Sequence, residues 1–123
     1  MQPTLRFSRK DRLKSRKSID ALFQSGKRAS VEEWRAHYHF RAAQGLQLGV
    51  GAPTRNFKKA VDRNRIKRLI REAYRLDQHR WKQALKQKQS GLDLFILYSG
   101  KALPDLTATQ AGLNKLFDKI FGG

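Results

Sequence analysis

Residues 58–75 constrain the fold more than any other part of this 123-residue chain, because they have the pattern of a helix with one apolar and one cationic face. At about 100° per residue, five side chains fall within one stripe roughly 100° wide. These five are Asp62, Ile66, Leu69, Ile70 and Ala73. Because four of them are apolar, we expect this stripe to pack on the hydrophobic core.

The opposite side of the same helix is strongly cationic, with Arg63 and Arg65 on its flanks. An arc of about 100° holds Asn64, Lys67, Arg68, Arg71 and Arg75. Like charges four residues apart destabilise an isolated helix by a few tenths of a kcal/mol per pair, so a merely solvated face would usually alternate signs. Guanidinium groups bind phosphate bidentately, and a carboxamide can pair with a base edge or a 2′-OH. The pattern therefore favours a polyanionic partner over the alternative of a solvated surface.

The overall composition agrees with that interpretation. The chain has 27 Lys and Arg against 10 Asp and Glu, a formal charge of +17, and 39% hydrophobic residues, which together exclude a basic tail that is disordered throughout. Its length predicts a single domain over 1–123, with a basic N-terminal arm at 1–14. The charge pattern favours RNA as the ligand of this domain. The absence of cysteine excludes disulfides and thiolate sites and makes the cytoplasm the default location. No apolar run approaches the roughly 18 residues that span a membrane, so we expect no membrane partner.

Hydrophobic periodicity predicts the elements before the basic helix. A short helix is expected over 16–25, with Ser15 as its N-cap and Gly26 as a left-handed stop. Residues 34–41 alternate apolar and polar side chains, and 46–50 continue the alternation. This pattern predicts two strands that form an antiparallel hairpin.

The elements after the basic helix complete the predicted architecture. Residues 79–91 are expected to be a helical extension followed by a loop, and the apolar run 92–98 a central strand buried on both faces. A last helix follows Pro104, where Thr107 and Gln110 have capping-box spacing. The resulting order α-β-β-α-β-α predicts an α/β (α+β) two-layer sandwich with a small mixed sheet.

The sequence contains no recognisable catalytic constellation. Gly49 and Gly51 are not followed by a phosphate-loop pattern, and the sparse acids form no pair that suggests a nuclease centre. His37 and His39 have a spacing that could hold a metal, but no third ligand lies nearby in the sequence, so we expect no metal site in the protein. We expect these two rings either to lie on an exposed polar strand face or to stack against nucleobases. Stacking is plausible chemistry because a surface of cations and flat rings suits unpaired nucleotides.

The basic segment resembles the central helix of a known family, the protein subunit of bacterial ribonuclease P. Residues 59–75 match that helix around its Arg-Asn-Arg core, here Arg63, Asn64 and Arg65. Three further segments resemble the family's N-terminal helix and the strands before and after the basic helix: 12–26, 48–50 and 92–98. The resemblance implies a ribosomal-protein-S5-domain-2-like fold with a left-handed βαβ crossover. General connection rules predict the right-handed form in about 98% of cases.

The resemblance also implies a function. In that family an RNA subunit carries the catalytic centre and uses Mg²⁺ to remove the 5′ leader from precursor tRNA, while the protein assists. We therefore expect a noncatalytic subunit of an endoribonuclease whose partners are the catalytic ribonuclease P RNA and precursor tRNA. Mg²⁺ would be bound mainly by the RNA, and no protein partner is implied. The alternative is a structural RNA-binding protein of the ribosomal type, with no role in tRNA processing.

Two sets of site residues follow from the resemblance. The RNA-binding set comprises Arg55, Lys58, Lys59, Arg63, Asn64, Arg65, Lys67, Arg68 and Arg71. The leader cleft, between the first helix and the sheet, would be lined by Arg12, Lys14, Ile19, Phe23 and either His37 or Tyr38. The last choice stays open, because a shift of one residue in strand register exchanges the two faces.

Overall fold

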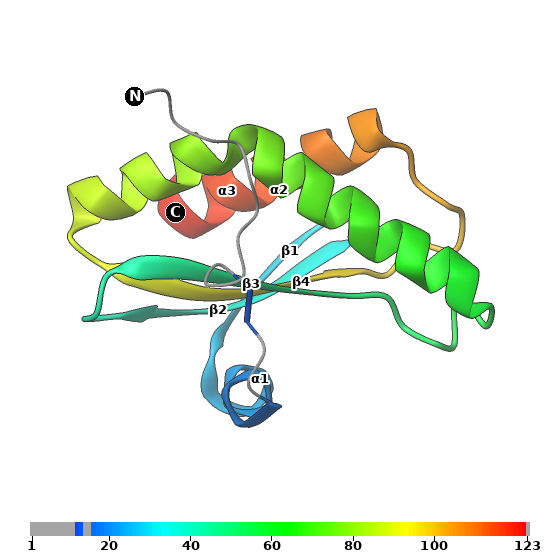
Figure 1. The fold of residues 1–123 in the computed structure, drawn as a ribbon, viewed down its shortest axis with the longest axis horizontal. Coiled ribbons are helices and arrows are strands. Elements are labelled where there is room, and N and C mark those ends of the chain that lie inside the picture. Colours follow the sequence, from blue (N-terminus) through cyan, green and yellow to red (C-terminus); the bar gives the residue numbers. More distant parts are fainter. Residues whose placement is uncertain (1–11, 14–15, 123) are drawn as a thin grey trace.

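Three helices and four strands make up the part of the chain that the computed structural model describes, residues 12–13 and 16–122. In chain order they are α1 (Arg16–Ser25), β1 (Lys27–Val31), β2 (Trp34–Arg41), β3 (Gly45–Gly51), α2 (Ala60–Lys88), β4 (Gly91–Tyr98) and α3 (Leu106–Gly122). The strands form one sheet in the order β1-β2-β4-β3. Helices α2 and α3 cover one face of this sheet, and α1 lies on the other (Figure 1). The predicted α+β sandwich with a mixed sheet is confirmed.

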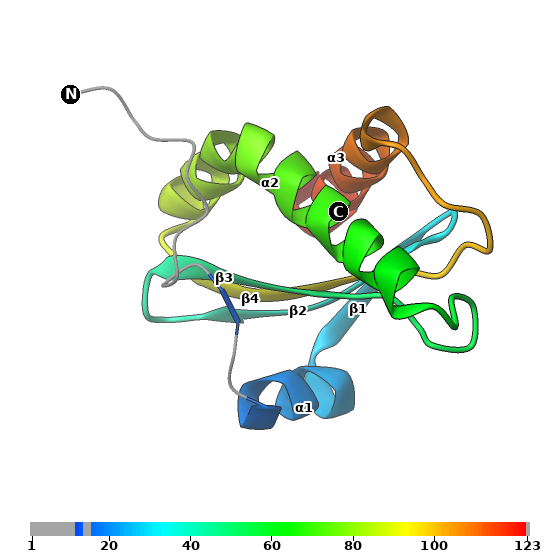
Figure 2. The same cartoon turned by 45° about the vertical axis from the view of Figure 1, so that its right-hand side comes forward.

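The sheet combines antiparallel and parallel pairs. Strand β2 pairs antiparallel with both β1 and β4, whereas β3 pairs parallel with β4. The parallel pair is joined by α2, which lies above the sheet and runs back over it (Figures 1 and 2). With both strands running upward and α2 toward the viewer, β4 lies to the left of β3. The crossover is therefore left-handed, as the resemblance implies and against the general rule.

The core lies between the sheet and the layer of α2 and α3. The buried residues of α2 recur every three or four positions and are Ile66, Ile70, Ala73, Tyr74, Gln78, Trp81 and Leu85. They pack with Leu92, Leu94 and Ile96 of β4 and with Leu113 and Leu116 of α3 in one cluster. Full burial of an aliphatic side chain stabilises a fold by about 1.5–3 kcal/mol. The predicted stripe is thus a core contact, and it continues three turns beyond Ala73 because α2 is one unbroken helix of 29 residues.

The predicted order of elements and the predicted strand pairing each need a correction. Residues 27–31 form β1, which was not predicted, so the element order is α-β-β-β-α-β-α. Only Ala29 of this polar strand is buried, which explains why it has no apolar periodicity. The expected hairpin of 34–41 with 46–50 does not form either, since β4 lies between them and pairs with both. Alternation determines which face a strand buries but does not identify its neighbour.

Three local predictions also need correction. Gly26 is not left-handed; glycine is required there because a Cβ would come within 2.6 Å of the Leu22 carbonyl oxygen. The α3 cap is Asp105, whose Oδ1 accepts a 2.7 Å hydrogen bond from the backbone N–H of Ala108, in place of Thr107. Strand β4 is central as predicted, but it is fully buried only on the face toward α2 and α3. The predicted cap Ser15 lies outside the described residues.

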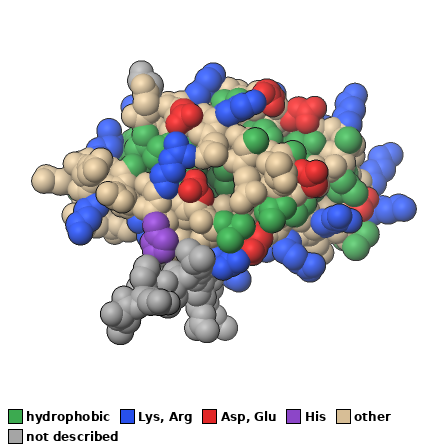
Figure 3. Space-filling model, turned by 90° about the horizontal axis from the view of Figure 1, so that it is seen from above, with side chains coloured by type: hydrophobic (Ala, Val, Ile, Leu, Met, Phe, Trp, Pro, Cys, Tyr) green, Lys and Arg blue, Asp and Glu red, His purple; other side chains and the backbone are tan. Residues whose placement is uncertain are grey.

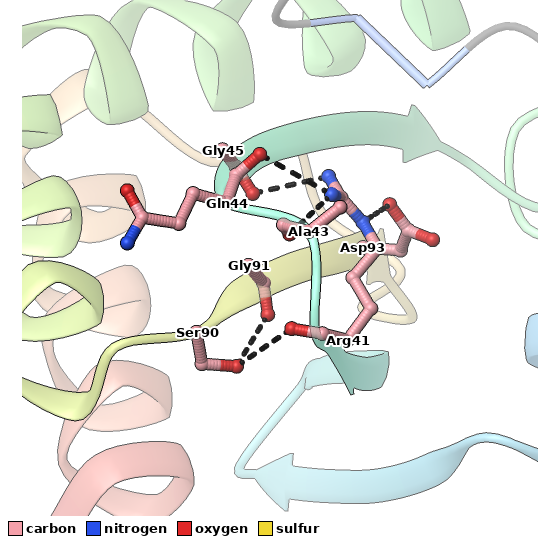
Figure 4. A network of polar contacts seen from close by, with 7 residues as sticks. All are labelled: Arg41, Ala43, Gln44, Gly45, Ser90, Gly91 and Asp93. Atoms are coloured by element: carbon pink, nitrogen blue, oxygen red, sulfur yellow. Dashed lines mark hydrogen bonds and ion pairs between the residues drawn. The ribbon is translucent and has the colours of Figure 1, made fainter.

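Arg41 holds the turn between β2 and β3 in place (Figure 4). Its Nε donates to Asp93 Oδ1 at 3.0 Å, its Nη1 to the Ala43 carbonyl at 2.7 Å, and its Nη2 to the Gly45 carbonyl at 3.0 Å. Gly91 begins β4 directly against this turn, and a methyl group there would overlap the Ala43 carbonyl oxygen. The turn therefore requires both an arginine and a close approach of two backbones.

We predict that Gly91→Ala lowers the free energy of unfolding by more than about 2 kcal/mol, because the added methyl group would push the turn off Arg41. Urea denaturation measures this loss. The control is Gly122→Ala, where a Cβ would meet nothing within 4 Å, and we expect no loss there. Equal stability of Gly91→Ala and the unsubstituted protein would contradict the described geometry.

Candidate nucleic-acid interface

The face of α2 opposite its buried stripe presents the predicted cations. Asn64, Arg65 and Arg68 are exposed, while Lys67 and Arg71 are half-buried. Among the described residues, no carboxylate lies within ion-pair distance of Arg65, Lys67 or Arg68. Figure 3 looks onto the helical layer and shows Lys and Arg side chains gathered at the end where α2 begins. Such a surface suits a phosphate backbone.

Arg75 is an exception within the predicted cationic arc. Its Nη2 lies 2.6 Å from Glu72 Oε1, and its Nε donates to Glu72 Oε2 at 3.0 Å. These hydrogen bonds lower the pKa of the Glu72 carboxyl and raise the pKa of the Arg75 guanidinium. Arg75 is therefore partly neutralised within the protein, and the rest of the predicted cationic arc, Asn64, Lys67, Arg68 and Arg71, lies between residues 64 and 71 of α2.

Arg63 supports the segment that precedes α2. Its Nη1 donates to the carbonyls of Phe57 and Lys58, both at 2.8 Å. This places the exposed Lys58 and Lys59 at the start of α2, where free backbone N–H groups and the helix dipole also favour anions. Arg55 is exposed in the preceding loop. Of the RNA-binding set, Arg63 thus has a structural role that its sequence position alone did not reveal.

On the other face of the sheet, α1 contributes to a cluster of aromatic rings. The Phe23 ring centroid lies 4.3 Å from that of His37 and 5.1 Å from that of Phe95. The strand register pairs His37 with Phe95 across β2 and β4, so both rings face α1. Ile19 is half-buried near Phe95 at the same face. The predicted set of cleft residues omits Phe95. Successive residues of 92–98 alternate between the two faces of β4, and this alternation is the signal that would have placed Phe95 on the face toward α1.

The structure resolves the choice between His37 and Tyr38. Tyr38 lies on the opposite face of β2, where its ring packs 5.8 Å from that of Phe40 within the core layer. Tyr38 therefore does not line the predicted leader cleft, because successive side chains of a strand point to opposite faces. Lys14 lies outside the described residues.

His37 is an uncharged flat ring near neutral pH. Burial lowers its pKa, and the Arg28 guanidinium, on the residue that pairs with it in β1, lowers it further. Its Nδ1 is buried and has no hydrogen-bond partner within residues 12–13 and 16–122. A neutral imidazole beside Phe23 can stack on a base.

The two surfaces meet at the edge of β3 that faces away from β4. The backbone N–H of Leu13 donates to the Leu48 carbonyl at 2.8 Å, which holds Arg12 beside this edge. A cavity of about 230 Å³ is lined by Arg12, by Arg71 of α2 and by Phe95, which lies on the α1 face of the sheet. Burial lowers the pKa of Arg71, and the charge of Arg12 lowers it further. An anion between these two guanidinium groups would relieve their repulsion.

Neither a metal cluster nor a membrane span is found in the described part of the chain. No three His, Asp or Glu side chains there are grouped so that they could hold a metal ion. None of the described helices is long and apolar enough to cross a bilayer. What the described side chains offer is a surface of cations, one carboxamide and aromatic rings.

Comparisons with known proteins are consistent with this surface. The family model for Ribonuclease P matches residues 7–121. The "Ribonuclease P protein component" of Porphyromonas gingivalis W83 is 33% identical over 124 residues, which cover 98% of this chain and 90% of that protein. The protein of the same name from Nitrosococcus oceani is 36% identical over 91 residues, covering 74% and 70%.

Solved structures show the same fold. The RNase P protein from Thermotoga maritima superposes with a TM-score of 0.69 at 23% identity and covers 88% of this chain and 96% of that one. The RNase P protein from Staphylococcus aureus gives 0.66 at 16% identity, covering 89% and 94%. At these identities the likeness concerns the fold, which agrees with the sandwich described above.

The lowered pKa of His37 predicts a pH dependence of stability. The unfolded chain binds a proton near the ordinary histidine pKa of about 6.5, whereas the folded chain does so only at lower pH. Stability is therefore full above about pH 6.5 and falls as the pH drops below it. Thermal unfolding between about pH 7.5 and pH 5 should show this loss, and His37→Gln should flatten the profile. The matched substitution His39→Gln, at an exposed position of the same strand, shows what the loss of a histidine does without the Phe23 contact. An unchanged profile for His37→Gln would refute the prediction.

Proposed function

The chain belongs to the bacterial ribonuclease P protein family, whose role is the processing of tRNA 5′ leaders together with an RNA subunit, and from this premise we propose how it acts. It binds the catalytic ribonuclease P RNA and the 5′ leader of precursor tRNA, and it assists Mg²⁺-dependent removal of that leader. The alternative of a ribosomal-type protein has no support in these comparisons, because the relatives are named as ribonuclease P proteins.

One observation carries the proposal: the cationic face of α2 and the aromatic cluster under α1 meet at a single sheet edge. Arg12 beside that edge and Arg71 of α2 line one cavity there. An RNA strand leaving the cationic face would therefore pass between two guanidinium groups before it reaches Phe23 and His37. Arginine forks suit phosphate, and each base stacked on a ring gains about 1–3 kcal/mol.

The protein contributes electrostatics and positioning to the reaction. Where substrate and catalytic RNA converge, their phosphates repel each other, and Arg65, Lys67 and Arg68 would reduce that repulsion. Mg²⁺, held mainly by RNA and substrate, would supply the charge stabilisation at the scissile phosphate. By neutralising nearby phosphates the protein lowers the amount of Mg²⁺ that assembly requires. The leader, held in the cleft, fixes the register of the substrate.

The test is cleavage of a precursor tRNA by the catalytic RNA at limiting Mg²⁺, with and without this chain. We expect the chain to raise the rate strongly at low Mg²⁺ and little at high Mg²⁺, because its cations and Mg²⁺ neutralise the same phosphates. Raising monovalent salt should diminish the stimulation. The control is the chain alone, which should not cleave. Absence of stimulation at every Mg²⁺ concentration would overturn the proposal.

A further inference from the structure

The face of β3 toward α1 is almost bare of side chains. Pairing with β4 places residues 45, 47, 49 and 51 on the same side of the sheet as Phe95, and all of them except Gln47 are glycine. Glycine in a strand interior weakens the strand and often marks a place where another group approaches the backbone closely. Beside β4 this face of the sheet therefore has a strip that lacks side chains.

The ring of Phe95 extends over this strip. A Cβ at Gly49 would lie 2.5 Å from Phe95 Cδ2, and a Cβ at Gly51 would lie 3.0 Å from Phe95 Cε1, so a side chain at either position would displace the ring. Phe23 contacts the same ring edge to face, with the two centroids 5.1 Å apart. Phe95 is nonetheless only half-buried, and it lines the cavity of about 230 Å³ at the β3 edge. A firmly held aromatic ring thus borders a cavity.

Phe95 belongs to a row of residues that crosses all four strands. It pairs with Gly49 of β3 and with His37 of β2, and His37 in turn pairs with Arg28 of β1. Directly paired residues share a face of the sheet, so the whole row lies on the side of α1. Neighbouring strands are about 4.8 Å apart, which makes the row about 14 Å long. A chain laid along it would meet bare backbone, a phenyl ring, an imidazole and a guanidinium in turn.

Arg28 is available for a ligand at the β1 end of the row. It is exposed, and in the described part of the chain no carboxylate lies within ion-pair distance of its guanidinium. Arg35 lies on the same face but is engaged differently, because its Nη1 donates to the carbonyls of Glu32 at 2.6 Å and of Trp34 at 3.2 Å. Arg28, unlike Arg35, therefore keeps its donors for a phosphate.

The chemistry of the row fits an unpaired RNA strand. A ring can stack on a base that is splayed out of a duplex, and a guanidinium binds the phosphates that follow along the same strand. We propose that the 5′ leader crosses the sheet along this row, with one base stacked on Phe95 and a phosphate farther along bound by Arg28. The proposal rests on the proposed function, since it takes the leader as the strand held in the cleft. Neither residue belongs to the two sets predicted from the sequence.

The variant Phe95→Leu removes the ring and keeps an apolar side chain. The measured quantity is the leader effect, which is kcat/KM for a precursor tRNA with a leader of about ten nucleotides divided by kcat/KM for one with a single-nucleotide leader. With the assembled protein–RNA complex, we expect Phe95→Leu to lower this ratio about tenfold, as the loss of one stacked base would. The matched control is Phe40→Leu, a half-buried ring on the opposite face of β2, which should leave the ratio unchanged. Urea denaturation verifies that both variants fold.

An abasic nucleotide, moved one position at a time through the leader, locates the stacked base. At that position we expect the abasic nucleotide and Phe95→Leu each to lower kcat/KM, and their combination to lower it no further, because both remove the same contact. At every other position the two losses should multiply. Multiplied losses at all positions would overturn stacking on Phe95.

The variant Arg28→Gln tests the far end of the row. Its kcat/KM should equal that of the unsubstituted chain for short leaders and fall below it once the leader reaches β1, two strand spacings or about 10 Å beyond Phe95. For long leaders the log–log salt slope should become shallower by about 0.7, the value for one phosphate contact on a single strand. The matched control is Lys27→Gln, the neighbouring exposed cation on the opposite face of β1, which should follow the unsubstituted chain at every leader length.

The outcomes separate this path from the proposed function. A leader effect that is present with the unsubstituted chain and survives both Phe95→Leu and Arg28→Gln would overturn the path and leave the proposed function intact. A loss in Arg28→Gln that is the same at every leader length would overturn the phosphate contact at β1. The absence of any leader effect with the unsubstituted chain would overturn both the path and the leader binding on which it rests.

Discussion

The packing of one face of α2 onto the sheet is the interaction on which the rest of the structure depends. Ile66, Ile70 and Trp81 are fully buried along almost the whole helix, so α2 is held rigidly from its first turns to its last. The same rotation that buries this stripe turns Arg65 and Arg68 outward. Packing of the buried stripe therefore also fixes the orientation of the cationic face. The left-handed crossover places that face beside the edge of β3.

This arrangement concentrates positive charge at some cost to the isolated protein. A formal charge of +17 on 123 residues disfavours compaction, and Arg12 and Arg71 repel each other across the β3 edge. Arg63 and Arg41 show a different use of arginine, since both donate to backbone carbonyls: Arg63 fixes the segment before α2, and Arg41 fixes the turn between β2 and β3. Some arginines of this fold thus stabilise the structure, and others are available for binding. Their hydrogen-bond partners distinguish the two groups, and these partners cannot be identified from the sequence.

Much of the fold could be predicted because strong periodicities occur in α1, α2 and β4, and the structure confirms all three elements. The failures have physical reasons. Strand β1 buries only Ala29, and the neighbour of β2 depends on long-range pairing that local alternation does not encode. His37 lines the cleft and Tyr38 does not because of the register of β2, which long-range strand pairing determines. The roles assigned to the RNA-binding set stay predictions, although the structure exposes most of its members.

The central claim is that the two faces of α2 are separable, one for folding and one for RNA. Arg68→Ala tests it most directly, when binding to ribonuclease P RNA is measured across salt concentrations beside urea denaturation. We expect a salt slope reduced by about 1 and a free energy of unfolding unchanged within about 0.5 kcal/mol. Arg75→Ala is the control, because its guanidinium is paired with Glu72 and should alter the slope less. A large loss of stability in Arg68→Ala, or an unchanged salt slope, would contradict the account.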